Sequence, residues 1–269
     1  TLFRSPDKPA GRGKKISASP VKIFALEKGL KILQPTNLKS PEFIQELRSI
    51  EPDLQIVVAF RMLPKVVWEL PSLGTFNLHA SLLPKYRGAA PINHAIINGE
   101  KETGLTTFLI DEEIDTGKIL MVQKVPIQDT DTAGSLHDKL MEEGAQLVVD
   151  TVRRIEKEQL VPVKQEDFAA NISSLPKAPK IHKEDCRINW NNNVKIVYDF
   201  IRGLSPYPAA FSELIPENQN DKPLLVKIFR GEKIPNEHNL TPGTIKTDNR
   251  SFLHVACKNG FIAIKEMQQ

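Results

Sequence analysis

The segment FNLHASLLPKYRGAAP, residues 76–91, decides the fold of this chain. Its first residues alternate between apolar and polar side chains, which predicts a β-strand with Asn77 and His79 pointing to the same side. Pro84 and Gly88 then end the strand in a turn. A strand end that carries an amide and an imidazole beside such a turn is typical of the sites that α/β proteins build at their sheet edges.

The side chains of Asn77 and His79 favour proton transfer and oxyanion stabilisation. An Asn amide donates a hydrogen bond to an oxygen that gains negative charge, and an imidazole accepts or donates a proton near neutral pH. No Ser or Cys in a nucleophile-elbow motif stands beside them, so we expect no covalent intermediate. The alternative is that both side chains only satisfy hydrogen bonds at a strand end.

A second predicted strand, residues 104–110, runs into an acidic loop at residues 111–117. A carboxylate from this loop can orient the imidazole of His79 and stabilise its charged form. We choose Asp115 because the Thr-Gly pair after it predicts a tight turn. The alternatives are a plain solvated turn and a metal site, but the acids lack the spacing of a calcium loop.

Four motifs in this order resemble the formyltransferase family that uses 10-formyltetrahydrofolate: Asn77-x-His79, Ser81-Leu82-Leu83-Pro84, Gly88-Ala89-Ala90-Pro91 and Asp115-Thr116-Gly117. The resemblance runs from about Pro6 to the end of the chain. It implies that Asn77, His79 and Asp115 are catalytic and that the formyl donor is 10-formyltetrahydrofolate, without a metal ion. It also implies a set of folate-contacting residues: Arg61, Met62, Leu63, Ser81, Leu82, Leu83, Pro84, Asp111 and Ile114. For Met62 and Leu63, a plain core position is the alternative.

The resemblance implies an α/β fold with a Rossmann-like, mostly parallel sheet, followed by a small OB-like β-barrel. The patterns agree, since the apolar run at residues 54–60 is typical of a strand in a parallel sheet. Residues 132–159 predict an amphipathic helix with Thr132 as N-cap, and Gly144 is a position where this helix kinks or divides.

The resemblance also implies a domain organisation. We predict a catalytic domain at residues 1–160, a linker at residues 161–182 and a C-terminal barrel at residues 183–269. Short β-runs with turn signals between them support the barrel. Family members carry a further βα unit at the start of the catalytic domain and usually a longer C-terminal part, so we expect the chain to be truncated at both ends.

Residues 1–22 contain six basic residues and one acidic residue, a local net charge of +5 in a chain whose total is +3. The Pro and Gly content of residues 6–20 predicts a loop without regular elements. Such a cationic loop can bind a phosphate backbone, although a solvated linker has the same composition. In family members that act on initiator tRNA this insertion enters the acceptor end, which implies these RNA contacts: Lys8, Arg12, Lys14 and Lys15.

The implied reaction is transfer of the formyl group of 10-formyltetrahydrofolate to the α-amino group of methionyl initiator tRNA. Sugar-nucleotide formyltransferases and the hydrolase domain of a folate dehydrogenase could share the catalytic residues, so the acceptor amine stays open. A non-catalytic RNA-binding fragment is an alternative of another class. The hypothesis of a generic nucleotide-binding domain is weakened, because the sequence has no Gly-rich phosphate fingerprint.

The two cysteines, Cys186 and Cys257, have neither metal-ligand spacing nor a CxxC motif. This usage suits a reducing compartment. No apolar run approaches the roughly 20 residues of a membrane span, and no signal peptide is visible. We therefore expect a monomer without a membrane partner in the cytoplasm of a bacterium, or in an organelle.

Overall fold

The computed structural model describes residues 2–4, 6–7, 9–10, 15–16, 18–58, 62–169, 171–215 and 222–269. The chain divides into a first unit, residues 1–75, and a second unit, residues 76–269. In the described part of the chain, no helix combines the length and apolarity needed to cross a membrane.

The first unit is built from short elements. Its strands are β1 (Leu2–Phe3), β2 (Pro9–Ala10), β3 (Lys15–Ile16), β4 (Ile32–Leu33) and β5 (Gln55–Val58), and its helices are α1 (Pro20–Glu27), α2 (Pro41–Ser49) and α3 (Lys65–Trp68). β1 and β4 pair in parallel, whereas β2 and β3 pair antiparallel. The expectation that residues 6–20 hold no regular element is therefore wrong, because a two-residue pair needs few backbone hydrogen bonds and tolerates Pro at an edge.

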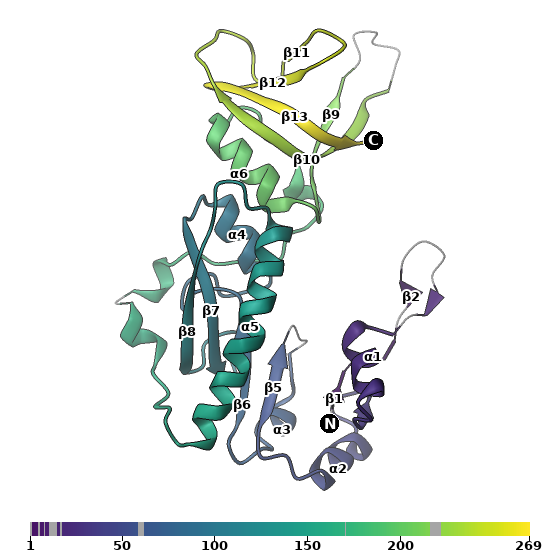
Figure 1. Ribbon diagram of the computed structural model, residues 1–269, viewed down its shortest axis with the longest axis vertical. Helices are drawn as coiled ribbons and strands as arrows, with labels where there is room; N and C mark the ends of the chain where they lie inside the picture. The colour runs from purple at the N-terminus through teal and green to yellow at the C-terminus, as the bar shows by residue number, and fades with distance from the viewer. Residues whose placement is uncertain are drawn as a thin grey trace. The chain divides into compact units, whose positions relative to one another are not determined.

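The second unit begins with three strands that run antiparallel: β6 (Thr75–His79), β7 (Glu102–Leu109) and β8 (Ile119–Pro126). The α/β part of the fold is thus mixed, because β1 and β4 pair in parallel while β6, β7 and β8 pair antiparallel. Helix α5 (Ala133–Glu156) runs along β7 and β8, as Figure 1 shows, and α4 (Pro91–Ile97) also packs against it. Their shared core contains buried side chains of Ile96, Leu105, Val125, Leu136, Leu140 and Leu147.

Helix α5 begins at the predicted cap. The Thr132 hydroxyl accepts a hydrogen bond from the Ser135 N–H at 3.1 Å, and the Ser135 hydroxyl accepts one from the Thr132 N–H at 2.9 Å. This reciprocal pair is a capping box. The expectation that Gly144 divides the helix is wrong, because α5 is continuous, while a kink at this position stays a prediction. A Cβ at Gly144 would lie 2.8 Å from a methyl of Leu78, so glycine allows close packing there.

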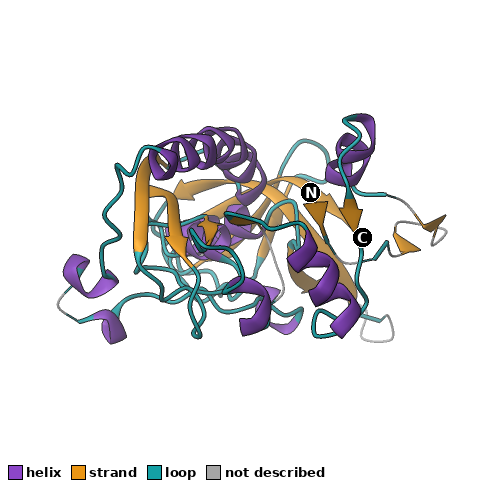
Figure 2. Cartoon of the chain, turned by 90° about the horizontal axis from the view of Figure 1, so that it is seen from below, coloured by secondary structure: helices purple, strands orange, loops and turns teal. Residues whose placement is uncertain are grey.

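The connection from α5 to α6 (Val194–Leu204) consists of loops and short 3-10 turns (Figure 2). The turns are η1 (Gln165–Phe168), η2 (Ile172–Ser174) and η3 (Glu184–Cys186). Val163 in this connection exchanges backbone hydrogen bonds of 2.8 and 2.9 Å with Ile119 of β8. Ala178 forms a β-bridge with Gly88. The segment predicted as a linker is thereby hydrogen-bonded to β8 and to the turn that follows β6.

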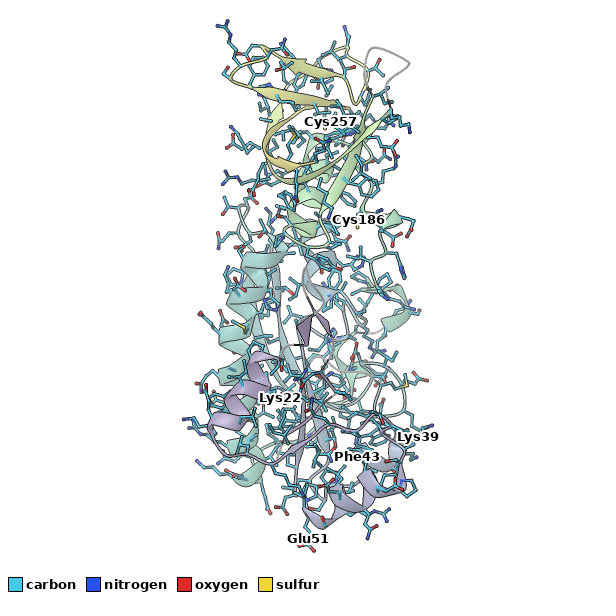
Figure 3. The ribbon with its side chains drawn as sticks, turned by 90° about the vertical axis from the view of Figure 1, so that its right-hand side faces the viewer. Lys22, Lys39, Phe43, Glu51, Cys186 and Cys257 are labelled. Atoms are coloured by element: carbon cyan, nitrogen blue, oxygen red, sulfur yellow. The ribbon has the colours of Figure 1, made fainter. Side chains whose placement is uncertain are left out.

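The C-terminal part is a curled five-stranded antiparallel sheet in the order β11-β12-β13-β10-β9 (Figure 1). Its strands are β9 (Ala210–Leu214), β10 (Leu224–Pro235), β11 (Ile245–Thr247), β12 (Leu253–Cys257) and β13 (Gly260–Gln268). Helix α6 packs on this sheet, and Cys186 and Cys257 lie in the core between them (Figure 3). Both thiols are free, and burial raises the pKa of Cys257 to about 12.

Candidate functional site

Asn77 and His79 both lie in β6 and are buried, with exposed fractions of 4% and 7%. The side-chain oxygen Oδ1 of Asn77 has no hydrogen-bond partner among the residues that the structure describes. Buried polar atoms in native proteins are nearly always paired, so an orphaned acceptor of this kind is a place where a ligand or water binds.

His79 is oriented by a main-chain atom. Its Nε2 lies 2.9 Å from the carbonyl oxygen of Tyr86. Because a carbonyl only accepts hydrogen bonds, Nε2 carries the proton, and Nδ1 is the nitrogen that can accept one. Nδ1 faces Oδ2 of Asp115 at 3.7 Å, which is longer than a hydrogen bond. The Tyr86 carbonyl makes the hydrogen bond to the ring, and Asp115 stands opposite the other nitrogen within ion-pair distance. The orienting role of Asp115 stays a prediction.

Tyr86 presents its carbonyl through an unusual backbone conformation. Its φ is +60°, in the left-handed region that side chains other than glycine rarely adopt. The side chain is buried and anchors this residue, since its hydroxyl donates to Glu100 at 2.8 Å and accepts from the Asn98 amide at 3.1 Å. Burial raises the pKa of Tyr86 to about 12. The phenol thus stays neutral and holds the carbonyl in place.

Asp115 is buried in the loop after β7. Its Oδ2 accepts a hydrogen bond of 2.9 Å from the Gly88 N–H, and its own φ is +58°. Gly117 closes the turn so tightly that a Cβ there would lie 1.6 Å from the carbonyl oxygen of Leu109. The carboxylate of Asp115 and the turn at Gly88 are in this way tied together beside His79.

The predicted folate segment at residues 81–84 is part of the fold of the second unit. The Ser81 hydroxyl donates to the Lys85 carbonyl at 2.7 Å, and Leu83 is buried against Phe108 and Ile119. Ser81, Leu83 and Pro84 are buried and Leu82 is half-buried. These side chains shape the backbone beyond β6, and only Leu82 offers a partly accessible surface.

The remaining predicted folate residues fall into two groups. Asp111 and Ile114 are exposed in the loop of Asp115, where Asp111 accepts from the Thr116 hydroxyl at 2.6 Å. Met62 is exposed and Leu63 is buried, and both belong to the first unit. Arg61 lies outside the described residues.

The predicted RNA contacts lie almost entirely outside the described part of the chain. This applies to Lys8, Arg12 and Lys14, while Lys15 is described only as backbone in β3. Two other basic residues of the segment have an acidic partner. Asp7 accepts from Arg4 at 3.1 Å and from Lys22, which Figure 3 labels. The hydrogen bond from Lys22 lowers the pKa of Asp7, so these cations are partly neutralised.

Two residues beside the site were missed at the sequence level. The Gln165 amide donates to the carbonyl oxygens of Asp115 and Gly117, and Arg87 donates to the Gln165 carbonyl oxygen. No sequence pattern marks Gln165, because it stands alone in an irregular segment about 50 positions away from Asp115. Among the described residues, no three His, Cys, Asp or Glu side chains come together as a metal-binding group.

Comparison with known families covers nearly the whole chain. The family model described as formyl transferase matches residues 1–152, and the one described as formyl transferase, C-terminal domain, matches residues 180–269. A protein named methionyl-tRNA formyltransferase from Bacteroides fragilis is 57% identical over 267 residues, which are 99% of this chain and 82% of that protein. The protein of the same name from Flavobacterium johnsoniae is 48% identical over the same shares of the two chains.

Solved structures share the fold at lower identity. HypX from Aquifex aeolicus, in complex with tetrahydrofolic acid, has a TM-score of 0.63 at 21% identity, covering 91% of this chain and 40% of that one. The N-formyltransferase from Helicobacter canadensis, in complex with folinic acid and dTDP-3-aminofucose, has a TM-score of 0.64 at 21% identity, covering 97% and 86%. On the sequence matches, the chain belongs to the formyl transferase family, together with the relatives named methionyl-tRNA formyltransferase.

Proposed function

We propose that this chain transfers the formyl group of 10-formyltetrahydrofolate to the α-amino group of methionyl initiator tRNA. The observation that carries the proposal is the 57% identity, over 99% of the chain, to relatives named for this activity. The solved sugar N-formyltransferases are 20–24% identical to the chain. This contrast favours an aminoacylated tRNA over an amino sugar nucleotide as the acceptor.

The reaction forms one C–N bond and breaks another. The free amine attacks the formyl carbon, a tetrahedral species with a negative oxygen forms, and the bond from this carbon to N10 of the folate breaks. Overall, one proton leaves the amine and one is gained by N10. A site for this chemistry needs a hydrogen-bond donor for the oxyanion and a group that moves a proton.

The geometry of the second unit supports specific roles in this reaction. The amide of Asn77 donates to the formyl oxygen, and its orphaned Oδ1 accepts a hydrogen bond from the attacking amine. His79 takes the proton on Nδ1, because Tyr86 keeps the proton on Nε2. The carboxylate of Asp115, 3.7 Å from Nδ1, then stabilises the positive charge that forms on the ring.

The contacts to the two substrates are part of the same proposal. The folate is held by the turn after β6 and the loop at residues 111–117, while the contacts at residues 61–63 stay as the resemblance implies them. The cationic loop at residues 6–20 contacts the acceptor end of the tRNA. We propose the domain boundaries predicted from the sequence, with the barrel at residues 183–269 holding the tRNA. The localisation we propose is the bacterial cytoplasm, which the relatives from Bacteroides fragilis and Flavobacterium johnsoniae support, and the proposed state is a monomer.

A direct assay distinguishes the acceptors. The purified protein is incubated with 10-formyltetrahydrofolate labelled in the formyl group, and with either methionyl initiator tRNA or a dTDP-amino sugar. The proposal predicts label in the acid-precipitable tRNA fraction and none in the sugar nucleotide. Label in the sugar nucleotide alone would show that the chemistry was assigned correctly and the acceptor wrongly.

A further inference from the structure

Gln165 is a fully buried amide whose hydrogen-bonding capacity is filled by the residues around the site. Its Nε2 donates to the carbonyl oxygens of Asp115 at 2.9 Å and Gly117 at 2.8 Å. Its Oε1 accepts from Nε and Nη2 of Arg87 at 3.1 and 2.7 Å. Because carbonyl groups only accept and a guanidinium only donates, the amide has one possible orientation.

The contacts of Gln165 lie on both sides of the hydrogen bond that fixes Asp115. Arg87 directly precedes Gly88, whose N–H donates to the Asp115 carboxylate at 2.9 Å. The two carbonyl oxygens belong to Asp115 itself and to the turn that closes its loop. A single side chain from the connection between α5 and α6 therefore holds the donor segment and the acceptor segment together.

The backbone conformation of Asp115 has to be stabilised by its neighbours. Its φ of +58° lies in the left-handed region that is strained for a residue with a side chain, and such conformations persist when the surroundings over-determine them. Without the two hydrogen bonds from Gln165, the loop can relax toward an ordinary conformation. The carboxylate would then move away from Nδ1 of His79.

We propose that Gln165 is a positioning residue for formyl transfer, which acts through Asp115 and does not touch the substrates. This inference rests on the proposed function, in which Asp115 stabilises the charged form of His79. Loss of the two amide donors is expected to lower kcat by about 10-fold to 100-fold, the usual result of a small displacement in a catalytic group. The KM for the folate is expected to rise by a smaller factor than kcat falls, because Gln165 is not itself a folate contact, although it supports the loop that is.

The variant Gln165→Glu tests this role most closely, since it keeps the side-chain length and the contact to Arg87. It replaces the amide donor by a carboxylate oxygen that faces two carbonyl oxygens. The variant Gln165→Met removes the donors without adding charge, and it serves if the Glu variant does not fold. The control is Gln159→Glu, the same chemical change at an exposed position just after α5, which is expected to leave kcat and the melting temperature unchanged.

A double-mutant cycle with Asp115→Ala separates positioning from a general structural effect. If Gln165 acts through Asp115, its substitution lowers kcat in the wild-type background and by less than about 2-fold in the Asp115→Ala background. Equal losses in both backgrounds, or a folded Gln165 variant with wild-type kcat, overturn the inference. If Asp115→Ala alone keeps full activity, the proposed role of Asp115 is wrong, and the inference falls with it.

Discussion

The Nε2 atom of His79 lies 2.9 Å from the carbonyl oxygen of Tyr86, and this contact decides which ring nitrogen faces Asp115. A main-chain carbonyl that cannot donate keeps the proton on Nε2 and leaves Nδ1 opposite the carboxylate at 3.7 Å. The tautomer of the proposed proton acceptor thus depends on a backbone atom, whose position depends in turn on the buried side chain of Tyr86.

The first prediction concerns the phenol of Tyr86 at alkaline pH. Its pKa is raised from 10 to about 12 by burial, so between these values the unfolded state releases the proton while the folded state keeps it. Below pH 10 both states are protonated and the group makes no pH-dependent contribution. Above pH 10 the free energy of unfolding falls, by up to about 2–3 kcal/mol at pH 12.

Urea unfolding at pH 8 and at pH 11 measures this effect. The wild type is expected to lose about 1 kcal/mol more than Tyr86→Phe over this interval, because the variant has no phenol to titrate. At pH 8 the variant is itself less stable by about 1 kcal/mol, since Glu100 and Asn98 lose a partner. If the wild type and the variant lose the same free energy of unfolding between pH 8 and pH 11, the prediction of a raised pKa for Tyr86 is wrong.

The second prediction concerns the turn that closes the Asp115 loop. Gly117→Ala is expected to cost about 3 kcal/mol or more, because its Cβ would lie 1.6 Å from the Leu109 carbonyl oxygen. Gly29→Ala is the control: its φ is +62° but no atom lies within 4 Å of the added Cβ, so the expected cost is about 1 kcal/mol. The melting temperatures of the two variants are compared with that of the wild type. An equal drop in melting temperature for both variants would contradict the prediction.

The third prediction concerns a buried ion pair in α6. Arg202 donates to Asp199 at 2.8 Å and to the carbonyl oxygens of Asp131 and Gln128 at 2.8 and 3.2 Å. Arg202→Met leaves the carboxylate of Asp199 buried with only Lys195 as a charged partner among the described contacts. We expect a loss of about 3 kcal/mol in the free energy of unfolding.

The matched control for this prediction is Arg153→Met. Arg153 pairs with Asp150 at 3.6 Å on the exposed face of α5, and both side chains are exposed. Exposed pairs contribute little, so the expected loss is below about 1 kcal/mol. Denaturant titration of both variants at one pH checks the difference. A loss at Arg202 as small as at Arg153 would mean that the buried pair adds no stability.

The strand that carries the candidate catalytic residues could be predicted from sequence, while its surroundings could not. The alternation of apolar and polar side chains around Asn77 and His79 is a local property of the sequence, and these residues form the strand β6 in the structure. The tautomer of His79 depends on the backbone conformation of Tyr86, which no side-chain pattern reveals. Gln165 reaches the site only through the packing of an irregular segment.

Gly144 shows the limit of local rules in another way. A glycine inside a helix weakens it when the helix is considered alone, which is why a kink was predicted. In the structure the missing Cβ is the space that Leu78 of β6 occupies, so the helix runs through Gly144 without a break and packs closely on the sheet. Tertiary packing reversed the local preference at this position.

The central claim is that Asn77 stabilises the oxyanion of formyl transfer. The variant Asn77→Ala removes a buried acceptor that has no partner among the described residues, so the variant is expected to stay folded. The control Asn191→Ala changes an exposed Asn and is expected to keep wild-type turnover.

Single-turnover formyl transfer to methionyl initiator tRNA at saturating 10-formyltetrahydrofolate tests the claim most directly. The account predicts that Asn77→Ala lowers the rate of the chemical step by about 10²–10³, while folate binding changes only a few-fold. A folded Asn77→Ala protein whose rate stays within a few-fold of the wild type would contradict the account.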